Sequence, residues 1–364
     1  DEEGEEGEGE DEDSDDEQEE TTKKKTTATT KKTTTTRPRA TAPPTTRAPA
    51  ADANPFSKKT FYDRPTHKKA YDYAIKYTSG GTKDNLKKMR NVPSAFWVSN
   101  KANIKPFEAL LKDAAAKSPP ELVVMIWYDL PNRDCASKAS TGEICCNKNE
   151  DGTCDYDDQD NCSDGIREYK STYVDPLVSV LQEYTLEKDV PVVVVLEPDS
   201  LPNLATNAAN PHCGKATAEG YKTGIKYALD ELTSKTGAAV YIDAANGGWL
   251  GWEKNMVGFM KIIKGMDLPL EKIRGFTTNV AKYQPLGVMC PWESHDSGTY
   301  QNGHCLAEQH ADDPCCKDPC HLLGQYSPAN NELNYVQKLV RAADGILGME
   351  AHVVIDTSRN GWEG

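Results

Sequence analysis

The sequence predicts an α/β fold in which parallel strands form a (β/α) barrel or a doubly wound sheet. The apolar run at residues 190–196, with four consecutive valines, indicates a strand buried on both faces. Further runs of this kind alternate with helix-length segments along the chain. Polar residues follow these runs directly, and the carboxyl edge of a parallel sheet is where active sites lie.

Five strands are expected, and each ends at a carboxylate or an amide. They span residues 122–128, 190–196, 238–242, 273–278 and 352–355. The polar residues that follow them are Asp129, Glu197 with Asp199, Asp243, Asn279 and Asp356. Helices are expected at residues 173–187, 216–234 and 331–343. Taken alone, Asp199 or Ser200 could simply cap a helix that begins at Leu201, but convergence of five strand ends favours a shared site.

The side chains at this edge favour glycoside hydrolysis. They include Asp134, Asp199 and Asp243, with Trp249 and Trp252 in a glycine-rich loop. The sequence contains no glycine-rich phosphate loop, no HExxH metal motif and no GxSxG nucleophile motif. Carboxylate pairs protonate a leaving oxygen and direct water, and indole faces stack on sugar rings. A tryptophan inside a strand is expected to pack in the core instead, and this applies to Trp127.

Four segments resemble glycoside hydrolase family 6, which comprises inverting cellobiohydrolases and endoglucanases that cut β-1,4-glucan. They are DLPNRDCAS (129–137), VVVVLEPDSLPNLATN (192–207), YIDAANGGWLGW (241–252) and RGFTTNVAKY (274–283). Residues 54–56 and 92–97 also resemble the family's first strand region. The resemblance implies a distorted (β/α) barrel of about seven parallel strands, an active site at their carboxyl ends and no cofactor or metal.

The resemblance also implies catalytic roles. Asp199 matches the family's proton donor, and Asp134 matches a second aspartate that supports it. Two close carboxylates resist double ionisation, so Asp134 would keep Asp199 protonated near neutral pH. Tyr128 and Ser140 match residues that shape the scissile-bond subsite and its water. The base is either a direct carboxylate or a water chain to Asp134.

The substrate-binding residues implied by the resemblance lie around the same edge. They are Asp243, Asn246, Trp249, Trp252, Asn279 and Lys282. Two of them depart from the family pattern, because the family has a histidine at the position of Asn246 and an asparagine at that of Lys282. Residues 65–67 also stand where a sugar-stacking tryptophan is expected.

These departures keep two functions open. The first is a β-1,4-glucanase that acts by inversion, either from chain ends or internally. The second is a non-catalytic glucan-binding or cell-wall protein on the same scaffold. The family continues for many tens of residues beyond the block that residues 354–361 resemble, so we expect the domain to be C-terminally incomplete.

The first 53 residues differ in composition from the rest. Residues 1–20 contain 15 acidic side chains, which matches the net charge of the whole chain, −15. Such a segment cannot build a core, so we expect a disordered acidic tail. Residues 21–53 are rich in Thr, Lys and Pro, which is typical of a mucin-like linker. Residues 54–364 are long enough for one large catalytic domain.

The 11 cysteines indicate an oxidising compartment and hence a secreted protein. The family resemblance pairs Cys135 with Cys213. The other nine form two clusters that look like insertions into rim loops: Cys145, Cys146, Cys154 and Cys162, then Cys290, Cys305, Cys315, Cys316 and Cys320. We expect disulfides, with zinc as the alternative or calcium beside the acidic run 155–160. The odd total leaves one thiol unpaired.

The expected partners are cellulose or β-1,4-glucan oligosaccharides. Neither a signal peptide nor a membrane span is apparent, and we expect a processed N-terminus. No nucleic-acid partner is expected, and the protein is expected to be a monomer.

Overall fold

The structure is a computed structural model that describes residues 54–137, 139–282, 284–289, 329 and 331–358. The predicted acidic tail and linker lie outside these residues, as does the second cysteine cluster. The domain boundaries therefore stay predictions.

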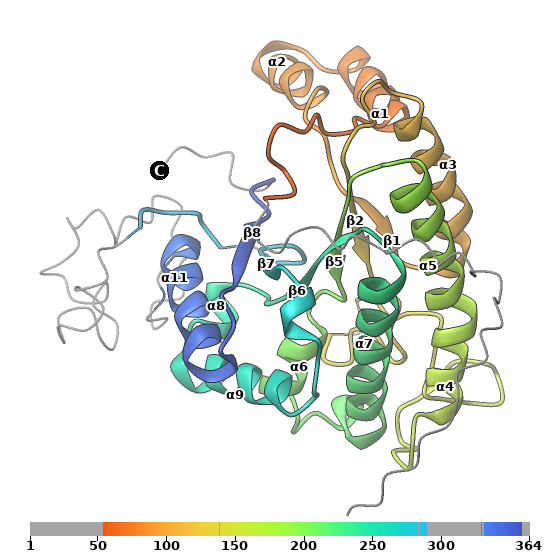
Figure 1. The fold of residues 1–364 in the computed structure, drawn as a ribbon, viewed down its shortest axis with the longest axis vertical. Coiled ribbons are helices and arrows are strands. Elements are labelled where there is room, and N and C mark those ends of the chain that lie inside the picture. The colour runs from red at the N-terminus through yellow and green to blue at the C-terminus, as the bar shows by residue number, and fades with distance from the viewer. Residues whose placement is uncertain (1–53, 138, 283, 290–328, 330, 359–364) are drawn as a thin grey trace, which may run out of the picture. The chain divides into compact units, whose positions relative to one another are not determined.

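Six parallel strands form one sheet in the described part of the chain (Figure 1). They are β1 (Phe96–Val98), β2 (Val123–Trp127), β5 (Val192–Leu196), β6 (Ala239–Asp243), β7 (Gly275–Thr278) and β8 (His352–Ile355). Their order is β1-β2-β5-β6-β7-β8, so neighbours in the sheet follow each other along the chain. A doubly wound sheet reverses direction at a switch point. The uninterrupted order is instead that of a (β/α) barrel, and the predicted α/β class is confirmed.

The central strands β5 and β6 are covered on both faces. In β5, Val192, Val194 and Leu196 join the large core beneath the helices, whereas Val193 and Val195 belong to two clusters on the other face. Successive side chains of a strand point to opposite faces, so a strand buried on both sides has no polar positions. This explains the continuous apolar runs in the sequence.

Helices α3, α5 and α7 stand side by side along the outside of the first strands (Figure 1). A continuous helical segment runs over residues 163–187, beginning ten residues before the predicted start at residue 173. The predicted helices at 216–234 and 331–343 are confirmed as α7 and α11. The α-helices are α1 (Pro65–Lys76), α2 (Gly80–Met89), α3 (Ile104–Ala115), α4 (Ser163–Glu168), α5 (Asp175–Gln182), α6 (Ser200–Thr206), α7 (Lys215–Lys235), α8 (Gly247–Leu250), α9 (Glu253–Lys264) and α11 (Glu332–Ala342).

Shorter helical turns complete the helical elements of the described residues. Three are π-helical: Tyr169–Val174, Glu183–Glu187 and Ala343–Leu347. Three are 3-10 turns: Lys101–Asn103, Pro211–Cys213 and Leu270–Lys272. No helix of the described residues is both long enough and apolar enough to cross a lipid bilayer.

Trp127 is fully buried in the core, as predicted. Its indole Nε1 donates a hydrogen bond to the hydroxyl of Tyr169, 2.8 Å away. Its ring also meets Tyr173 edge-on, with the ring centroids 5.3 Å apart. The bond satisfies the polar atom of the indole, which otherwise would carry a desolvation cost.

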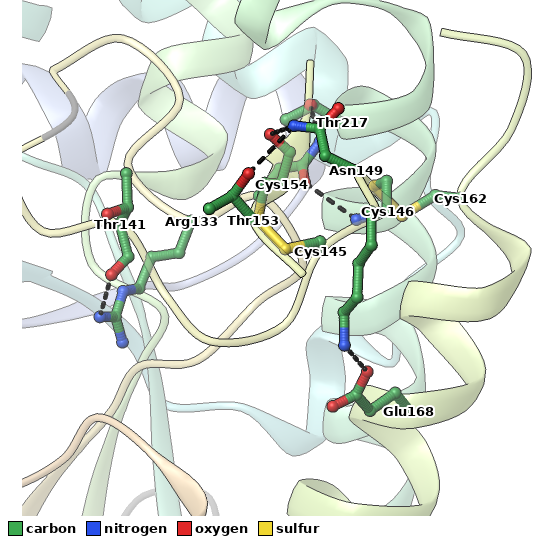
Figure 2. The surroundings of a disulfide bond; sticks show 12 residues. Arg133, Thr141, Cys145, Cys146, Asn149, Thr153, Cys154, Cys162, Glu168 and Thr217 are labelled. Atoms are coloured by element: carbon green, nitrogen blue, oxygen red, sulfur yellow. Dashed lines mark hydrogen bonds and ion pairs between the residues drawn. A yellow bond between two sulfur atoms is a disulfide. The ribbon is translucent and has the colours of Figure 1, made fainter. Parts of the chain in front are cut away.

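Three disulfides hold the loops that follow β2. Cys135 is bonded to Cys213, as the family resemblance implies. In the first cysteine cluster, the pairs are Cys145–Cys154 and Cys146–Cys162 (Figure 2). A short antiparallel hairpin, β3 (Asn147–Lys148) with β4 (Cys154–Asp155), lies between these cysteines. The first cluster is therefore a disulfide-bonded insertion, as expected, and its cysteines do not bind zinc.

We expect the Cys135–Cys213 bond to stabilise the fold more than the Cys145–Cys154 bond. The two bonds close loops of 78 and 9 residues in sequence. In the chain-entropy model, losing the long-range bond costs about 4.5 kcal/mol of unfolding free energy and losing the short-range bond about 2.6 kcal/mol. Urea unfolding of the two Cys→Ala double variants measures the difference. Equal losses would contradict the model.

Candidate active site

The carboxyl ends of the strands form one rim that carries acidic side chains. Because the strands are parallel and in register, with Trp127 beside Leu196 and Ile242 beside Leu196, the residues after each strand meet at one edge. Asp129 follows β2, Asp199 follows β5, and Asp243 is the last residue of β6. The predicted convergence of polar groups at this edge is thus present.

Left-handed backbone conformations are concentrated on this rim. Nine non-glycine residues in the described part of the chain have positive φ, and six of them follow strands at this edge. These six, with φ between 48° and 64°, are Asn132, Asp134, Glu197, Asp199, Ala245 and Asn279. Such conformations cost free energy and persist only where the surroundings enforce them. Their clustering is an independent sign of a functional site.

Asp243 holds the backbone of Asp199. Its Oδ1 accepts hydrogen bonds from the Asp199 N–H at 2.9 Å and from the Ala245 N–H at 3.0 Å. The Asp243 side chain is buried. Burial raises the pKa of Asp243 well above its usual range, and the negative charge of Asp199 raises it further. Asp243 therefore takes up a proton more readily when Asp199 is ionised.

Asp134 lies in the loop after β2 and is held from two sides. Its Oδ2 accepts a hydrogen bond from the Ser140 N–H at 2.8 Å. The next residue, Cys135, is fixed by its disulfide to Cys213. The Ser140 contact is made by the backbone, and the residue is exposed at the loop surface.

The charges of both predicted catalytic aspartates act on the phenol of Tyr128. The ring is buried beneath the guanidinium of Arg133, 4.3 Å from its centroid. Burial raises the pKa of the Tyr128 phenol, and the charges of Asp134 and Asp199 both raise it further. Both predicted catalytic carboxylates thus act electrostatically on the same phenol.

A buried network beneath the rim was not among the predicted site residues. Glu197 accepts hydrogen bonds from the hydroxyl of Tyr169 at 2.7 Å and from the N–H groups of Asp129 at 3.2 Å and Leu130 at 3.4 Å. Burial raises the pKa of Glu197 to about 7. The signal in the sequence was a glutamate placed directly after an unbroken apolar run.

Asp129 and Arg133 form the second part of this network. Arg133 Nη1 lies 3.3 Å from Asp129 Oδ1 and 2.6 Å from the carbonyl oxygen of Tyr128. The side chain of Asp129 is fully buried, and burial raises its pKa to about 9 while the charge of Arg133 opposes the rise. The network fixes the start of the loop that carries Asp134.

The predicted sugar platforms lie in and beside the short helix α8. Trp249 is half-buried, and its Nε1 donates to Thr206 Oγ1 at 2.7 Å. Trp252 is also half-buried, at the end of the same loop. The ammonium of Lys282 lies 5.8 Å from the Trp249 ring centroid. Two predicted substrate-binding residues, Trp249 and Lys282, are therefore neighbours.

The two predicted substrate-binding asparagines, Asn246 and Asn279, are more buried than the tryptophans. Asn246 is buried and precedes α8. Asn279 is buried too; its Nδ2 donates to the Gln284 carbonyl oxygen and its Oδ1 accepts from the Gln284 N–H, both at 3.0 Å. Asn279 thus shapes the loop that carries Lys282.

No cluster of three or more His, Cys, Asp or Glu side chains in the described residues could hold a metal ion. In the acidic run, Asp155 Oδ1 accepts from the N–H groups of Asp157 and Asp158. These bonds use the Asp155 Oδ1 atom to close a local turn of the backbone.

The fold and the rim define an α/β-barrel protein with paired carboxylates at the strand ends. The family model for glycosyl hydrolases family 6 matches residues 56–364, and the chain belongs to this family. "Exoglucanase 3" of Agaricus bisporus is 30% identical over 313 residues, 85% of this chain and 59% of that protein. "Probable 1,4-beta-D-glucan cellobiohydrolase C" of Aspergillus niger is 32% identical over 337 residues, 89% of this chain and 62% of that protein.

Solved structures show the same similarity. CcCel6C of Coprinopsis cinerea is 28% identical with a TM-score of 0.64, covering 86% of this chain and 75% of that chain. The CcCel6A catalytic domain, complexed with p-nitrophenyl beta-D-cellotrioside, is 29% identical with a TM-score of 0.64. The match covers 85% of this chain and 74% of that chain. The chain spans about three fifths of the length of the curated relatives it matches, 59% for the first of them.

We expect Glu197 to make the stability of the protein depend on pH. Its pKa rises from 4.5 to about 7 in the folded state, so the folded protein holds a proton that the unfolded chain releases. Stability therefore falls as pH rises from about 4.5 to about 7, by up to about 1.4 kcal/mol per pH unit for this group. Asp129 acts in the same direction. Glu197→Gln should flatten the dependence.

Thermal unfolding of wild type and Glu197→Gln between pH 4 and 8 measures this effect. Glu187, exposed at the end of the helical segment that contains Tyr169, provides the matched control, since Glu187→Gln should keep the wild-type slope. An unchanged slope in Glu197→Gln would show that this carboxyl does not titrate in the range.

Proposed function

We propose that the protein hydrolyses β-1,4-glucosidic bonds of cellulose or a related β-glucan with inversion. Asp199 is the general acid, and Asp134 assists it. The family of the chain supports this reaction, because its named relatives are exoglucanases and cellobiohydrolases. The paired acidic residues at the rim supply the chemistry that such a reaction needs.

The observation that carries the proposal is the shared environment of Asp134, Asp199 and Tyr128. Both aspartates have left-handed backbones in loops after neighbouring strands, and both charges act on the phenol of Tyr128. The charge of Asp199 also raises the pKa of the buried Asp243, and two interacting carboxylates resist double ionisation. The Asp199–Asp243 pair therefore keeps a proton at the rim.

In the proposed reaction, Asp199 gives its proton to the glycosidic oxygen as the bond to the sugar carbon breaks. A water molecule attacks that carbon from the opposite face and loses its proton, either along a water chain to Asp134 or to a direct carboxylate. Asp199 becomes negative in this step, which raises the pKa of the buried Asp243. A neutral Asp243 keeps its Oδ1 available to the Asp199 N–H.

The proposed substrate contacts come from the loops after β6 and β7. Trp249 and Trp252 provide ring faces for sugars, and Lys282 and Asn246 provide polar contacts. The solved relative bound to p-nitrophenyl beta-D-cellotrioside supports a β-1,4-linked glucose chain as the ligand. We also propose that the protein is secreted, since its three described disulfides form and persist in an oxidising compartment. The expected monomeric state stays a prediction.

The second candidate is a non-catalytic glucan-binding protein. It is favoured by Lys282, whose ammonium lies over the ring of Trp249 where a sugar would stack, and by Asn246, whose carboxamide cannot accept a proton as a histidine does. Release of sugar by wild-type protein separates the two functions.

Asp199→Asn should lower turnover by about 100- to 10,000-fold, the usual contribution of a general acid. Asparagine is chosen because it tolerates the left-handed backbone of Asp199, at φ 63°. Binding of cellotetraose should stay within a few-fold of wild type, because the substitution removes the proton but not the side-chain volume. Reducing-sugar release from amorphous cellulose measures turnover, and calorimetry measures binding.

Asp267→Asn is the matched control. Asp267 also has a left-handed backbone, at φ 50°, but it is exposed in the loop before β7, at the amino end of the strands. The turnover of Asp267→Asn should equal that of wild type. Near wild-type turnover in Asp199→Asn would show that another group is the acid, whereas wild-type protein that binds cellotetraose without releasing sugar would favour the second candidate.

A further inference from the structure

The segment that contains α1 and α2 has a charge opposite to the rest of the domain. Residues 54–92 contain ten Lys and Arg side chains and three Asp side chains, a net charge of +7. Residues 93–364 have a net charge of −14. We call residues 54–92 the positive hairpin. No residue of its two helices is buried, so each helix is at least partly open to solvent.

The three aspartates of the hairpin are already paired. Asp72 accepts two bonds from Arg90, at 2.6 and 2.9 Å. The other pairs are Lys68–Asp63 at 2.9 Å and Lys87–Asp84 at 3.1 Å. The remaining lysines have no ion pair with a described residue, and five of the six are exposed: Lys58, Lys59, Lys69, Lys76 and Lys88. The surplus positive charge is therefore directed to solvent.

One face of α1 combines this charge with aromatic rings. Lys69, Tyr73, Lys76 and Tyr77 have the spacing i, i+4, i+7 and i+8, which places them on one side of a helix. All four are exposed, with Tyr73 at 66% and Tyr77 at 72%. The two tyrosine rings lie side by side, with centroids 4.9 Å apart. We call these four residues the Lys/Tyr face.

The Lys/Tyr face is separate from the rim. The segment before α1 is fixed by Arg64, which donates to Ser94 Oγ at 3.1 Å just before β1 begins. Phe61 pairs with Leu122 at the start of β2. The helix thus begins beside the amino ends of the strands, whereas the predicted catalytic residues follow their carboxyl ends.

We propose that the Lys/Tyr face of α1 binds an anionic, carboxylate-bearing polysaccharide. The tyrosines offer flat rings on which sugars stack, and the lysines offer positive charge to carboxylates between them. The charge of the hairpin favours an acidic glycan over a neutral one, because an ammonium attracts a carboxylate more strongly than it attracts a neutral hydroxyl. The inference does not rest on the proposed hydrolysis, since binding is measured without turnover.

Affinity electrophoresis of the full chain tests the proposal. Gels contain carboxymethylcellulose or neutral hydroxyethylcellulose, and excess cellotetraose occupies the rim. We expect Lys69→Gln/Lys76→Gln to weaken binding to the carboxylated polymer about tenfold, the combined effect of two exposed ion pairs. Tyr73→Ala/Tyr77→Ala should weaken it about fivefold. Both variants change only exposed side chains, so folding and cellotetraose binding should be unchanged.

Two control variants separate this face from general effects. Lys261→Gln/Lys264→Gln removes the same charge from the exposed side of α9 and should leave binding unchanged. Tyr73→Phe/Tyr77→Phe keeps the rings and should retain most of the affinity. Wild-type affinity in Lys69→Gln/Lys76→Gln, or equal losses in the α9 variant, would overturn the proposal. Equal binding of the wild type to both polymers would overturn it too.

Discussion

The geometry of the rim depends on the buried carboxylate of Glu197. It joins the end of β5 to the N–H groups of Asp129 and Leu130 in the loop after β2 and to the hydroxyl of Tyr169 in the surrounding helix. A buried carboxylate without partners carries a large desolvation cost, so the three donors must stay in place. The Glu197 side chain therefore ties together the two loops that present Asp134 and Asp199.

The Cys-rich insertion adds a second constraint to the Asp134 loop. Asn132, two residues before Asp134, accepts a hydrogen bond from the Cys146 N–H and donates one from its Nδ2 to Thr217 Oγ1, both at 2.9 Å. Cys146 is in turn bonded to Cys162 at the start of α4. The insertion is thus built into the wall of the site. Its rigidity is transmitted to the loop that holds Asp134, whose own backbone is left-handed.

The sequence predicts the strands and the chemistry of the rim more completely than the loops. Strands such as β5 are buried on both faces, so their apolar runs have no competing interpretation. The rim residues could be located because they follow those runs. The helical segment before residue 173 was missed, because its first turns lie in a polar, cysteine-rich stretch whose pattern is set by the disulfides. The pairing of Glu197 with the peptides of Asp129 and Leu130 has no sequence signal, since it depends on the register of β2 and β5.

The left-handed backbone of Asp199 also limits how this position can change over time. Asparagine and glycine tolerate that conformation, and each is one nucleotide away from an aspartate codon. Branched or bulky residues would strain the turn between β5 and α6 and would be removed by selection on folding. A descendant that lost the acid but kept the scaffold would therefore carry Asn or Gly at this position. A single nucleotide substitution would be enough to remove the general acid while the fold is kept.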